Sequence, residues 1–215
     1  LEMELTATGL GRTLVRPVAD PIRRPRIVDL KAPGSGEESR NRWENLACLN
    51  RRDEIKIGRT HLQDAMPIRL GQEFTAYAGT LARCRKRVVE AADYLNDLGI
   101  GGSAVGTGVT VEPEYPALMN THLRAITGIA SLRIGSDRIQ LMQSMGDAAA
   151  FSATLRGLAL DLSKIASDLR LMVSGPRTGL DEIVLPAVQP GSSIMPGKIN
   201  PSIPEMVNQV CFQVI

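Results

Sequence analysis

Residues 72–98 have the sequence QEFTAYAGTLARCRKRVVEAADYLNDL, in which apolar side chains recur every three or four positions. This spacing places them on one face of an α-helix, because a helix turns once in 3.6 residues. Charged residues such as Lys86 and Glu90 fall on other faces, and Gly71 and Gly99 flank the stretch as glycine often flanks helices. We therefore predict one amphipathic helix over residues 72–98. Its stripe consists of Phe74, Tyr77, Ala78, Leu81, Cys84, Val88, Ala91, Ala92, Leu95 and Leu98.

A second apolar stripe predicts another long helix over residues 144–173. The stripe consists of Leu155, Leu158, Leu162, Ile165, Leu169 and Met172. Ser174-Gly175-Pro176 should end this helix, and residues 205–215 are expected to form a third. The two long helices make about 80 Å of rod at 1.5 Å per residue, too long to enclose a compact core. We therefore predict an all-α fold, arranged as an elongated helical bundle.

The composition of the 215-residue chain, 43% apolar and 22% charged, is that of an ordinary globular protein. Its net charge of +2 gives no argument for binding nucleic acid or a membrane surface. No run approaches the ~20 apolar residues that cross a bilayer. Three cysteines (Cys48, Cys84 and Cys211) are odd in number and widely spaced, which indicates neither a disulfide framework nor a zinc site. A cytoplasmic protein is therefore expected.

The first 52 residues differ from the rest because arginine and proline are frequent in them. The stretch 32–36, with the sequence APGSG, resembles a linker. The basic bias would suit an arm that binds nucleic acid, but acidic residues are interspersed and no aromatic stacking platform accompanies them. We expect residues 1–52 to be a poorly ordered segment. From Asp53 onward the pattern is interpreted as helical, and residues 53–215 as one domain.

Residues 191–201, with the sequence GSSIMPGKINP, form the densest group of polar side chains. Their glycines and prolines disfavour a regular helix or strand, so we predict a shaped loop. Such a loop brings the hydroxyls of Ser192 and Ser193 near the ammonium of Lys198 and the amide of Asn200. These groups could hold a carboxylate and transfer a proton. The simpler alternative for a Ser/Gly/Pro stretch is a surface turn.

Residues 57–67, with the sequence IGRTHLQDAMP, form the second polar cluster. A histidine such as His61 can move a proton near neutral pH, while Thr60 and a neighbouring arginine can hold an anion. The alternative is a capped entrance to the following helix with a solvated histidine. The other histidine, His122, has no such neighbours and is interpreted as structural.

The glycine-rich stretch 98–108, with the sequence LGIGGSAVGTG, is not interpreted as a phosphate-binding loop. It lacks the Lys-Ser/Thr ending of such loops and follows a predicted helix rather than a strand. Small residues here are expected to let the backbone pass tightly between helices.

These motifs, taken in order, resemble the fumarase/aspartase superfamily over residues 53–215. The motifs are Gly-Arg-Thr-His-Leu-Gln-Asp at 58–64, Leu-Gly-Gln-Glu-Phe at 70–74, Gly-Gly-Ser-Ala-Val-Gly-Thr-Gly at 101–108, Ser-Gly-Pro-Arg at 174–177, and the loop at 191–201. The ending at 207–215 is more similar to the aspartate ammonia-lyase branch than to class II fumarases. Family members are more than twice this length, and the Ser-Ser-Asn type motif of their N-terminal third is absent here. A partial lyase domain is therefore expected.

The resemblance implies a lyase that removes ammonia from aspartate by anti elimination and releases fumarate. It implies a small dicarboxylate substrate and a homotetramer whose sites combine residues of different subunits, and we expect neither cofactor nor metal. By the same resemblance Ser192 is the catalytic base, while His61 works with the carboxylate of Glu205. The residues expected to bind substrate are Thr60, Ser193, Lys198, Ile199 and Asn200.

Two alternatives stay open at this point. The first is a class II fumarate hydratase, which interconverts fumarate and malate with the same loop. The second is an inactive truncated lyase fragment, or a helical module that only oligomerises with full-length subunits. The retained Ser192, Lys198, Asn200 and His61 favour an enzymatic ancestry, whereas the missing N-terminal motif favours lost activity.

Overall fold

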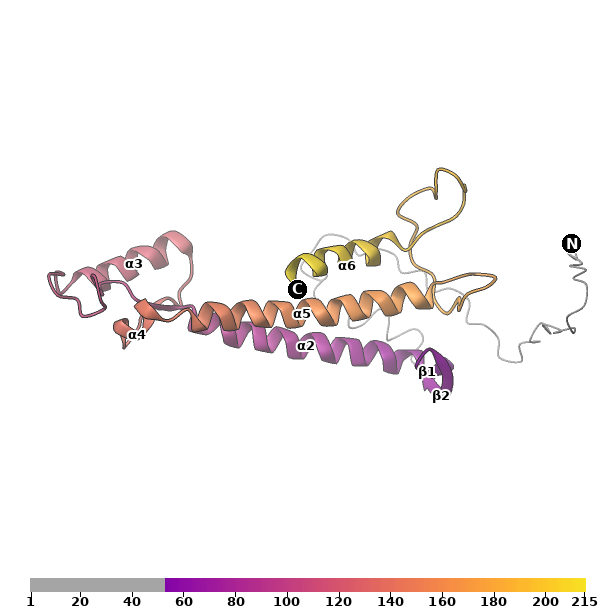
Figure 1. The fold of residues 1–215 in the computed structure, drawn as a ribbon, viewed down its shortest axis with the longest axis horizontal. Coiled ribbons are helices and arrows are strands. Elements are labelled where there is room, and N and C mark those ends of the chain that lie inside the picture. The colour runs from indigo at the N-terminus through magenta and orange to yellow at the C-terminus, as the bar shows by residue number, and fades with distance from the viewer. Residues whose placement is uncertain (1–52) are drawn as a thin grey trace, which may run out of the picture.

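The computed structural model describes residues 53–215, and this part of the chain is an elongated, mostly helical rod (Figure 1). Helix α2 (Leu70–Tyr94) and helix α5 (Gly146–Met172) run antiparallel along it, and α6 (Ser202–Val214) lies against α5. The predicted all-α elongated bundle is confirmed. The predicted arginine-rich segment 1–52, and with it Cys48, lies outside the described residues. No helix in the described part is long and apolar enough to cross a membrane.

The predicted helices agree closely with the observed ones except at one end of α2. Helix α5 starts and ends within two residues of the prediction for 144–173, and α6 starts three residues before the predicted 205. Helix α2 ends at Tyr94, four residues before the predicted end at Leu98. The reason is that Asp97–Leu98 forms strand β3, which pairs in parallel with β4 (Arg133–Ile134). A long-range pairing of this kind leaves no periodic signal in the local sequence.

Residues 55–69 form a β-hairpin, so the helical interpretation from Asp53 onward was wrong for this stretch. Strand β1 (Ile55–Thr60) pairs antiparallel with β2 (Gln63–Arg69), and the register shifts between Ile57 and Arg59. Gly58 occupies the shift, where a Cβ would lie 2.9 Å from the carbonyl oxygen of Met66. The hairpin is short, and Lys56 is its buried residue, whereas nearly all of β2 is exposed.

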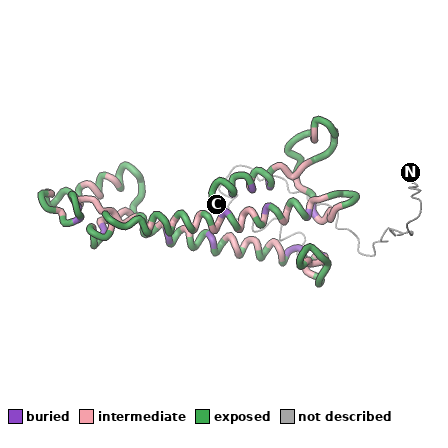
Figure 2. Tube along the Cα trace, in the orientation of Figure 1, coloured by how far each residue is buried: buried purple, intermediate pink, exposed green. Residues whose placement is uncertain are grey.

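The contact between the helices is made by small side chains. Cys84 and Ala91 of α2 are buried, as are Ala159 and Ala166 of α5. The larger side chains of both predicted stripes are mostly half-buried. Figure 2 shows the long helices mainly in pink and green, the colours of half-buried and exposed residues, with few buried positions in purple. Two helices and a short third cannot surround one another, so each keeps an open face.

Helix α6 is held on α5 by a buried amide. Asn208, only 4% exposed, carries its amide group between Ser163, Ser167 and Arg170 of α5 at distances of 3.0–3.3 Å. A buried amide needs several partners to offset its lost hydration, and this one has them. Asn208 therefore fixes the position of α6 along α5.

The far end of the rod carries α3 (Tyr115–Thr127) and α4 (Arg138–Gln143). The glycine-rich turn passes close to α4, since a Cβ on Gly106 would lie 2.4 Å from the Cα of Ile139. A Cβ on Gly101 would lie 2.4 Å from Cγ of Pro116 in α3. The expected tight passage of the backbone between helices is thus confirmed, and the two helices are α3 and α4. His122 lies exposed on α3.

A small apolar core closes the opposite end of the rod, next to the hairpin. Its buried members are Leu70, Met172 and Ile183. Five half-buried side chains pack against them: Phe74, Tyr77, Leu169, Val173 and Leu185. This core joins the start of α2, the end of α5 and the segment that follows α5, and so supports the regions that carry both polar clusters.

Candidate active site

The hairpin turn presents the first polar cluster at its tip. Thr60 pairs with Gln63, which leaves His61 and Leu62 as a two-residue turn with φ of 53° and 62°. The backbone twist of such a turn matches the twist of the two strands that it joins. The turn favours Asn-Gly, because most other side chains clash with the backbone at positive φ. Thr60, His61 and Leu62 are all exposed. The tip is thus a strained, open platform rather than the capped helix entrance considered as an alternative.

A network of four charged side chains lies beneath this tip. Arg59 donates from its two terminal nitrogens to the two carboxylate oxygens of Glu182, at 2.6 and 2.7 Å. Lys56 lies 2.8 Å from the same carboxylate and 2.6 Å from that of Glu73. The network joins β1 to the first turn of α2 and to the segment after α5.

The network controls the protonation of its members. Burial by itself would raise the pKa of the Glu182 carboxyl, but the hydrogen bonds from Arg59 and Lys56 outweigh it and lower that pKa below its usual value. The hydrogen bond with Glu182 raises the pKa of Arg59. Glu182 is therefore ionised at neutral pH, as a buried charge with two cationic partners should be.

A hollow of about 260 Å³ opens beside the tip, between the hairpin and the two long helices. Its lining residues are Arg59, His61, Leu62, Tyr77, Asp168, Leu171 and Met172. The Tyr77 hydroxyl donates to Oδ2 of Asp168 at 2.8 Å, and Lys164 pairs with the same carboxylate. Burial, followed by the hydrogen bond to Asp168, raises the pKa of Tyr77. Tyr77 is thus a neutral hydrogen-bond donor at any physiological pH.

The loop at residues 191–201 has the shaped form that its glycines and prolines predict. Gly191 and Pro196 form an isolated antiparallel bridge, and Gly191 has a φ of 118°. A Cβ on Gly191 would lie 2.8 Å from the nitrogen of Gly197, so only glycine fits where the chain closes on itself. The residues between them project outward, with Ile194 85% exposed.

The polar side chains of the loop sit on this projecting frame. Ser192 is half-buried, and its Oγ accepts a hydrogen bond from the backbone N–H of Ile194 at 3.4 Å. Asn200 is also half-buried, whereas Ser193, Lys198 and Ile199 are exposed. The loop therefore offers one half-buried hydroxyl, one half-buried amide and one exposed ammonium within a few residues.

The base of the loop is attached to the start of α6. The Ser202 backbone N–H donates to the carbonyl of Asn200 at 2.9 Å, and the Ser202 hydroxyl accepts from Nε2 of Gln189 at 2.9 Å. Glu205 follows in the first turn of α6, where it is exposed.

The structure brings the predicted residues together in two groups rather than one. Thr60 and His61 share the hairpin tip, while Ser192, Ser193, Lys198, Ile199, Asn200 and Glu205 share the loop and the start of α6. Figure 1 shows the hairpin and the loop on opposite sides of α5. The predicted pairing of His61 with Glu205 is therefore not formed within one chain.

Sequence analysis noted the arginine beside Thr60, Arg59, only as a possible anion binder. It missed the other three charged residues below the tip, which are Lys56, Glu73 and Glu182, and it missed the pair Tyr77–Asp168. Glu182 lies 123 residues from Arg59, and Asp168 lies 91 residues from Tyr77. Tyr77 was assigned to an apolar stripe, so its polar contact was not expected. Residues 53–69 were interpreted as helical, and that interpretation gave no reason to expect Lys56 to point inward. A recognised strand pattern at Ile55–Ile57 would have placed Lys56 on the opposite face from these two isoleucines.

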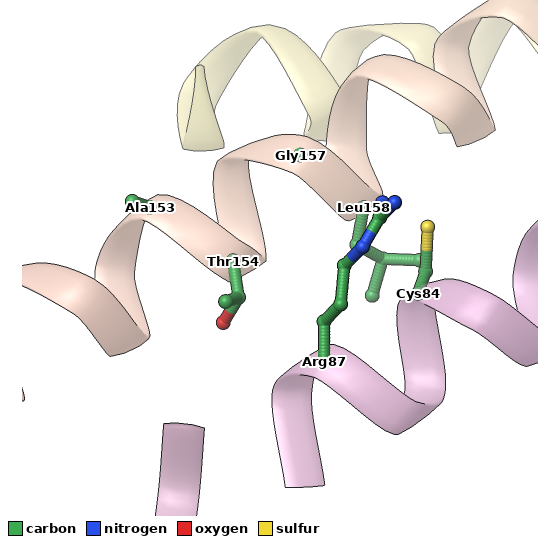
Figure 3. Close-up of a pocket in the computed structure, with 6 residues that line it drawn as sticks. All are labelled: Cys84, Arg87, Ala153, Thr154, Gly157 and Leu158. Carbon is green, nitrogen blue, oxygen red and sulfur yellow. The ribbon is translucent and has the colours of Figure 1, made fainter. Parts of the chain in front are cut away.

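A second hollow of about 240 Å³ lies between α2 and α5 and contains none of the predicted site residues (Figure 3). Cys84 and Arg87 of α2 face Ala153, Thr154, Gly157 and Leu158 of α5. The Cys84 thiol donates to Asp161 at 3.0 Å; this hydrogen bond, with burial, raises the pKa of Cys84. A thiol held in the protonated form is a poor nucleophile. This hollow therefore lacks the chemistry of the two polar clusters.

Comparison with known proteins places both groups of residues within one family. The profile of the family described as Lyase matches residues 47–215. The aspartate ammonia-lyase of a Bacillus species is 52% identical over 160 residues, which are 74% of this chain and 34% of that protein. The class II fumarate hydratase of Mycobacterium tuberculosis is 47% identical over 161 residues, again 34% of its length. The chain spans about a third of the length of these relatives.

Solved structures give the same result. A fumarate lyase:delta crystallin from Brucella melitensis, bound to cobalt, matches 75% of this chain and 35% of its own with a TM-score of 0.69 and 53% identity. The class II fumarase of Schistosoma mansoni matches 76% of this chain and 37% of its own with a TM-score of 0.71 and 32% identity. The described part of this chain therefore resembles about a third of each of these longer structures.

Proposed function

Since the chain belongs to the lyase family, we propose that it forms part of an enzyme that removes ammonia from L-aspartate and releases fumarate. The observation that carries this proposal is the extent of the family match: residues 47–215 include both the hairpin tip and the loop at 191–201. Identity of 52% to an aspartate ammonia-lyase supports the choice of branch.

The proposed chemistry begins at Ser192. Its oxygen takes a proton from the carbon next to one carboxylate of aspartate, and ammonia leaves the neighbouring carbon with the electrons of the C–N bond. A serine is a sufficient base only when its alkoxide is stabilised. The backbone N–H of Ile194 lies 3.4 Å from Ser192 Oγ, and the ammonium of Lys198 stands in the same loop. Closure of the projecting loop over substrate would exclude water and strengthen both interactions.

The substrate carboxylates would be held by donors from both groups. Lys198 and Asn200 supply an ammonium and an amide, with the Ser193 hydroxyl and the backbone at Ile199 beside them. Thr60 adds a hydroxyl and His61 an imidazole from the hairpin tip. The intermediate carries extra negative charge on one carboxylate, so donors aimed at that position stabilise it more than they stabilise aspartate.

We further propose that each site combines the hairpin of one subunit with the loop of another in a homotetramer. Within one chain the two groups lie on opposite sides of α5, yet the chemistry needs both. Helix α6 presents an exposed apolar row on its outer side, formed by Ile203, Met206, Val210 and Val214. Exposed apolar rows of this kind are typical of surfaces that become buried on association. In the assembly His61 could meet Glu205 of a neighbouring subunit.

The cellular location proposed for this enzyme is the cytoplasm. Cys84 and Cys211 are both free and buried, and buried free thiols persist in a reducing compartment.

Class II fumarate hydratase activity is the second candidate, favoured by the 47% identity to the Mycobacterium tuberculosis enzyme. The two reactions share fumarate and differ in whether ammonia or water adds to it. A chimera separates them: residues 53–215 replace the matching segment of the Bacillus aspartate ammonia-lyase, and fumarate absorbance is followed with aspartate and with malate. Fumarate from aspartate alone supports the proposal, and fumarate from malate alone replaces it with the hydratase. Fumarate from neither substrate favours an inactive remnant, for which self-association would be the remaining property.

A further inference from the structure

The local sequence does not favour the backbone conformation of the tip that carries Thr60 and His61. Its two turn residues adopt left-handed backbone angles, and neither is a glycine or an asparagine. Side chains such as that of Leu62 cost free energy in this region, so the conformation persists only where the surroundings impose it. The hairpin has only two strands, which is marginal without further support. Something outside the hairpin must therefore hold the tip.

We infer that Glu182 is the positioning residue that fixes this tip. Its carboxylate receives both terminal nitrogens of Arg59, the residue directly before Thr60, at 2.6 and 2.7 Å. Two parallel bonds fix the direction of a guanidinium as well as its distance. Both side chains are 14% exposed, so solvent competes little for the contact.

Glu182 is itself firmly anchored to the end of α5. Its backbone N–H donates to the carbonyl of Met172 at 2.9 Å, and the N–H of Asp181 donates to Ser174 at 2.8 Å. The next residue, Ile183, is 2% exposed and belongs to the apolar core with Met172. The carboxylate therefore stands on backbone that is hydrogen-bonded to the end of α5 and lies next to the apolar core, whereas the hairpin contacts it from outside.

Lys56 completes the support from the other side. Its ammonium lies between Glu182 and Glu73, at 2.8 and 2.6 Å, and its side chain is 7% exposed. Two cations and two carboxylates balance the buried charge. Without the Glu182 charge, Arg59 loses its two-bond partner and Lys56 keeps only the contact with Glu73 among those shown in the network. The strand that carries both cations would then lose its attachment to the segment after α5.

This inference rests on the proposed function for its consequence, because a loose tip would misplace Thr60 and His61 toward substrate. Its test does not need activity. The chain contains only two histidines, so selective ¹³C labelling gives two ring signals, His61 at the tip and His122 on α3 as an internal control. Hydrogen exchange of the amides at residues 57–66 reports opening of the hairpin.

In the folded 215-residue chain, Glu182→Gln should shift and narrow the His61 ring signal toward that of an unfolded peptide and leave the His122 signal in place. Amide exchange at residues 57–66 should become about 10- to 100-fold faster, the range expected from loss of hydrogen bonds to a charged group. Glu182→Asp keeps the charge and should restore part of both readouts. Unchanged His61 signal and exchange in Glu182→Gln would overturn the inference.

Two control variants separate positioning from general effects. Glu90→Gln removes a carboxylate from the exposed pair with Lys86 on α2 and should change neither readout. Asn208→Ala should lower the stability of the α6 contact but leave the His61 ring signal unchanged, so a change of that signal in this variant would contradict a local role of Glu182.

If Glu182→Gln loses helix content, the variant Arg59→Lys provides the test instead. It keeps the positive charge and removes the two-bond contact with Glu182. A change of the His61 ring signal that is smaller than in Glu182→Gln then supports the inference. An unchanged His61 signal in Arg59→Lys overturns it. Failure of the chimera to act on aspartate would affect none of these readouts.

Discussion

The hydroxyl of Tyr77 donates to Oδ2 of Asp168 at 2.8 Å, and this contact joins the two long helices across 91 residues of sequence. The Tyr77 ring also meets Phe74 edge-on, with the ring centroids 5.8 Å apart, and the Lys164 ammonium lies 5.1 Å from its centroid. A side chain with a polar group thus lies near the start of the apolar stripe of α2, at the wall of the hollow beside His61.

Replacement of Tyr77 by Phe should lower the free energy of unfolding by about 1–2 kcal/mol, because the Asp168 carboxylate loses one of its two donors, keeping Lys164, while the ring stays packed. In a chain of this length that corresponds to a fall of a few degrees, roughly 2–8 °C, in Tm. Thermal unfolding followed by circular dichroism measures it. Tyr94→Phe, at an exposed position of the same helix, is the control and should have no effect. Equal Tm values for both variants would show that the Asp168 contact adds nothing.

Acid should destabilise the chain partly through Glu182. Its folded pKa is lowered, so ionisation stabilises the native state above the unfolded pKa of about 4.3, and this contribution is lost as the pH falls through the folded pKa. The difference in unfolding free energy between the wild type and Glu182→Gln should therefore be largest at neutral pH and shrink below about pH 4. Urea unfolding across that pH range measures it, and a constant difference would be inconsistent with the lowered pKa.

The outer row of α6 should mediate self-association. Met206 and Val210 are 51% and 58% exposed, and a lysine at either position would place a charge within an apolar contact. Met206→Lys and Val210→Lys should shift the chain toward smaller species in sedimentation velocity. Gln209→Lys, one position off this row, should leave the distribution unchanged. If all three variants sediment like the wild type, another face forms the assembly.

In the chimera with the Bacillus enzyme, Ser192→Ala should abolish release of fumarate from aspartate with little change in substrate binding. The Ser192 oxygen is needed only when the proton moves, whereas Lys198 would hold a carboxylate before and during the reaction. Lys198→Ala should therefore weaken binding and turnover together. Steady-state kinetics and calorimetric titration separate the two effects. Near-normal turnover in Ser192→Ala would transfer the role of base to His61.

The long helices could be predicted from the sequence because their signal is local. Apolar residues recur at every helical turn from Leu155 to Met172, and Gly175 and Pro176 follow shortly after the end of the helix. The loop at 191–201 could also be predicted, since the positive φ values of Gly191 and Gly197 are conformations that few other residues tolerate.

The hairpin could not be predicted in the same way. Its turn uses His61 and Leu62 instead of Asn-Gly, and its shape depends on Glu182, which lies more than a hundred residues further along the chain. Contacts of this kind leave no periodicity for a local pattern to show. The early end of α2 has the same cause, since Asp97 pairs with Arg133.

Complementation between two inactive variants tests the shared site most directly. The chimera is prepared once with His61→Ala and once with Ser192→Ala, and the two proteins are unfolded, mixed and refolded together before assay with aspartate. If each site combines the hairpin of one subunit with the loop of another, mixed tetramers contain some sites with both residues intact. We expect each variant alone to be inactive and the mixture to recover a clear fraction of wild-type fumarate release. A mixture as inactive as its components would contradict a site shared between subunits.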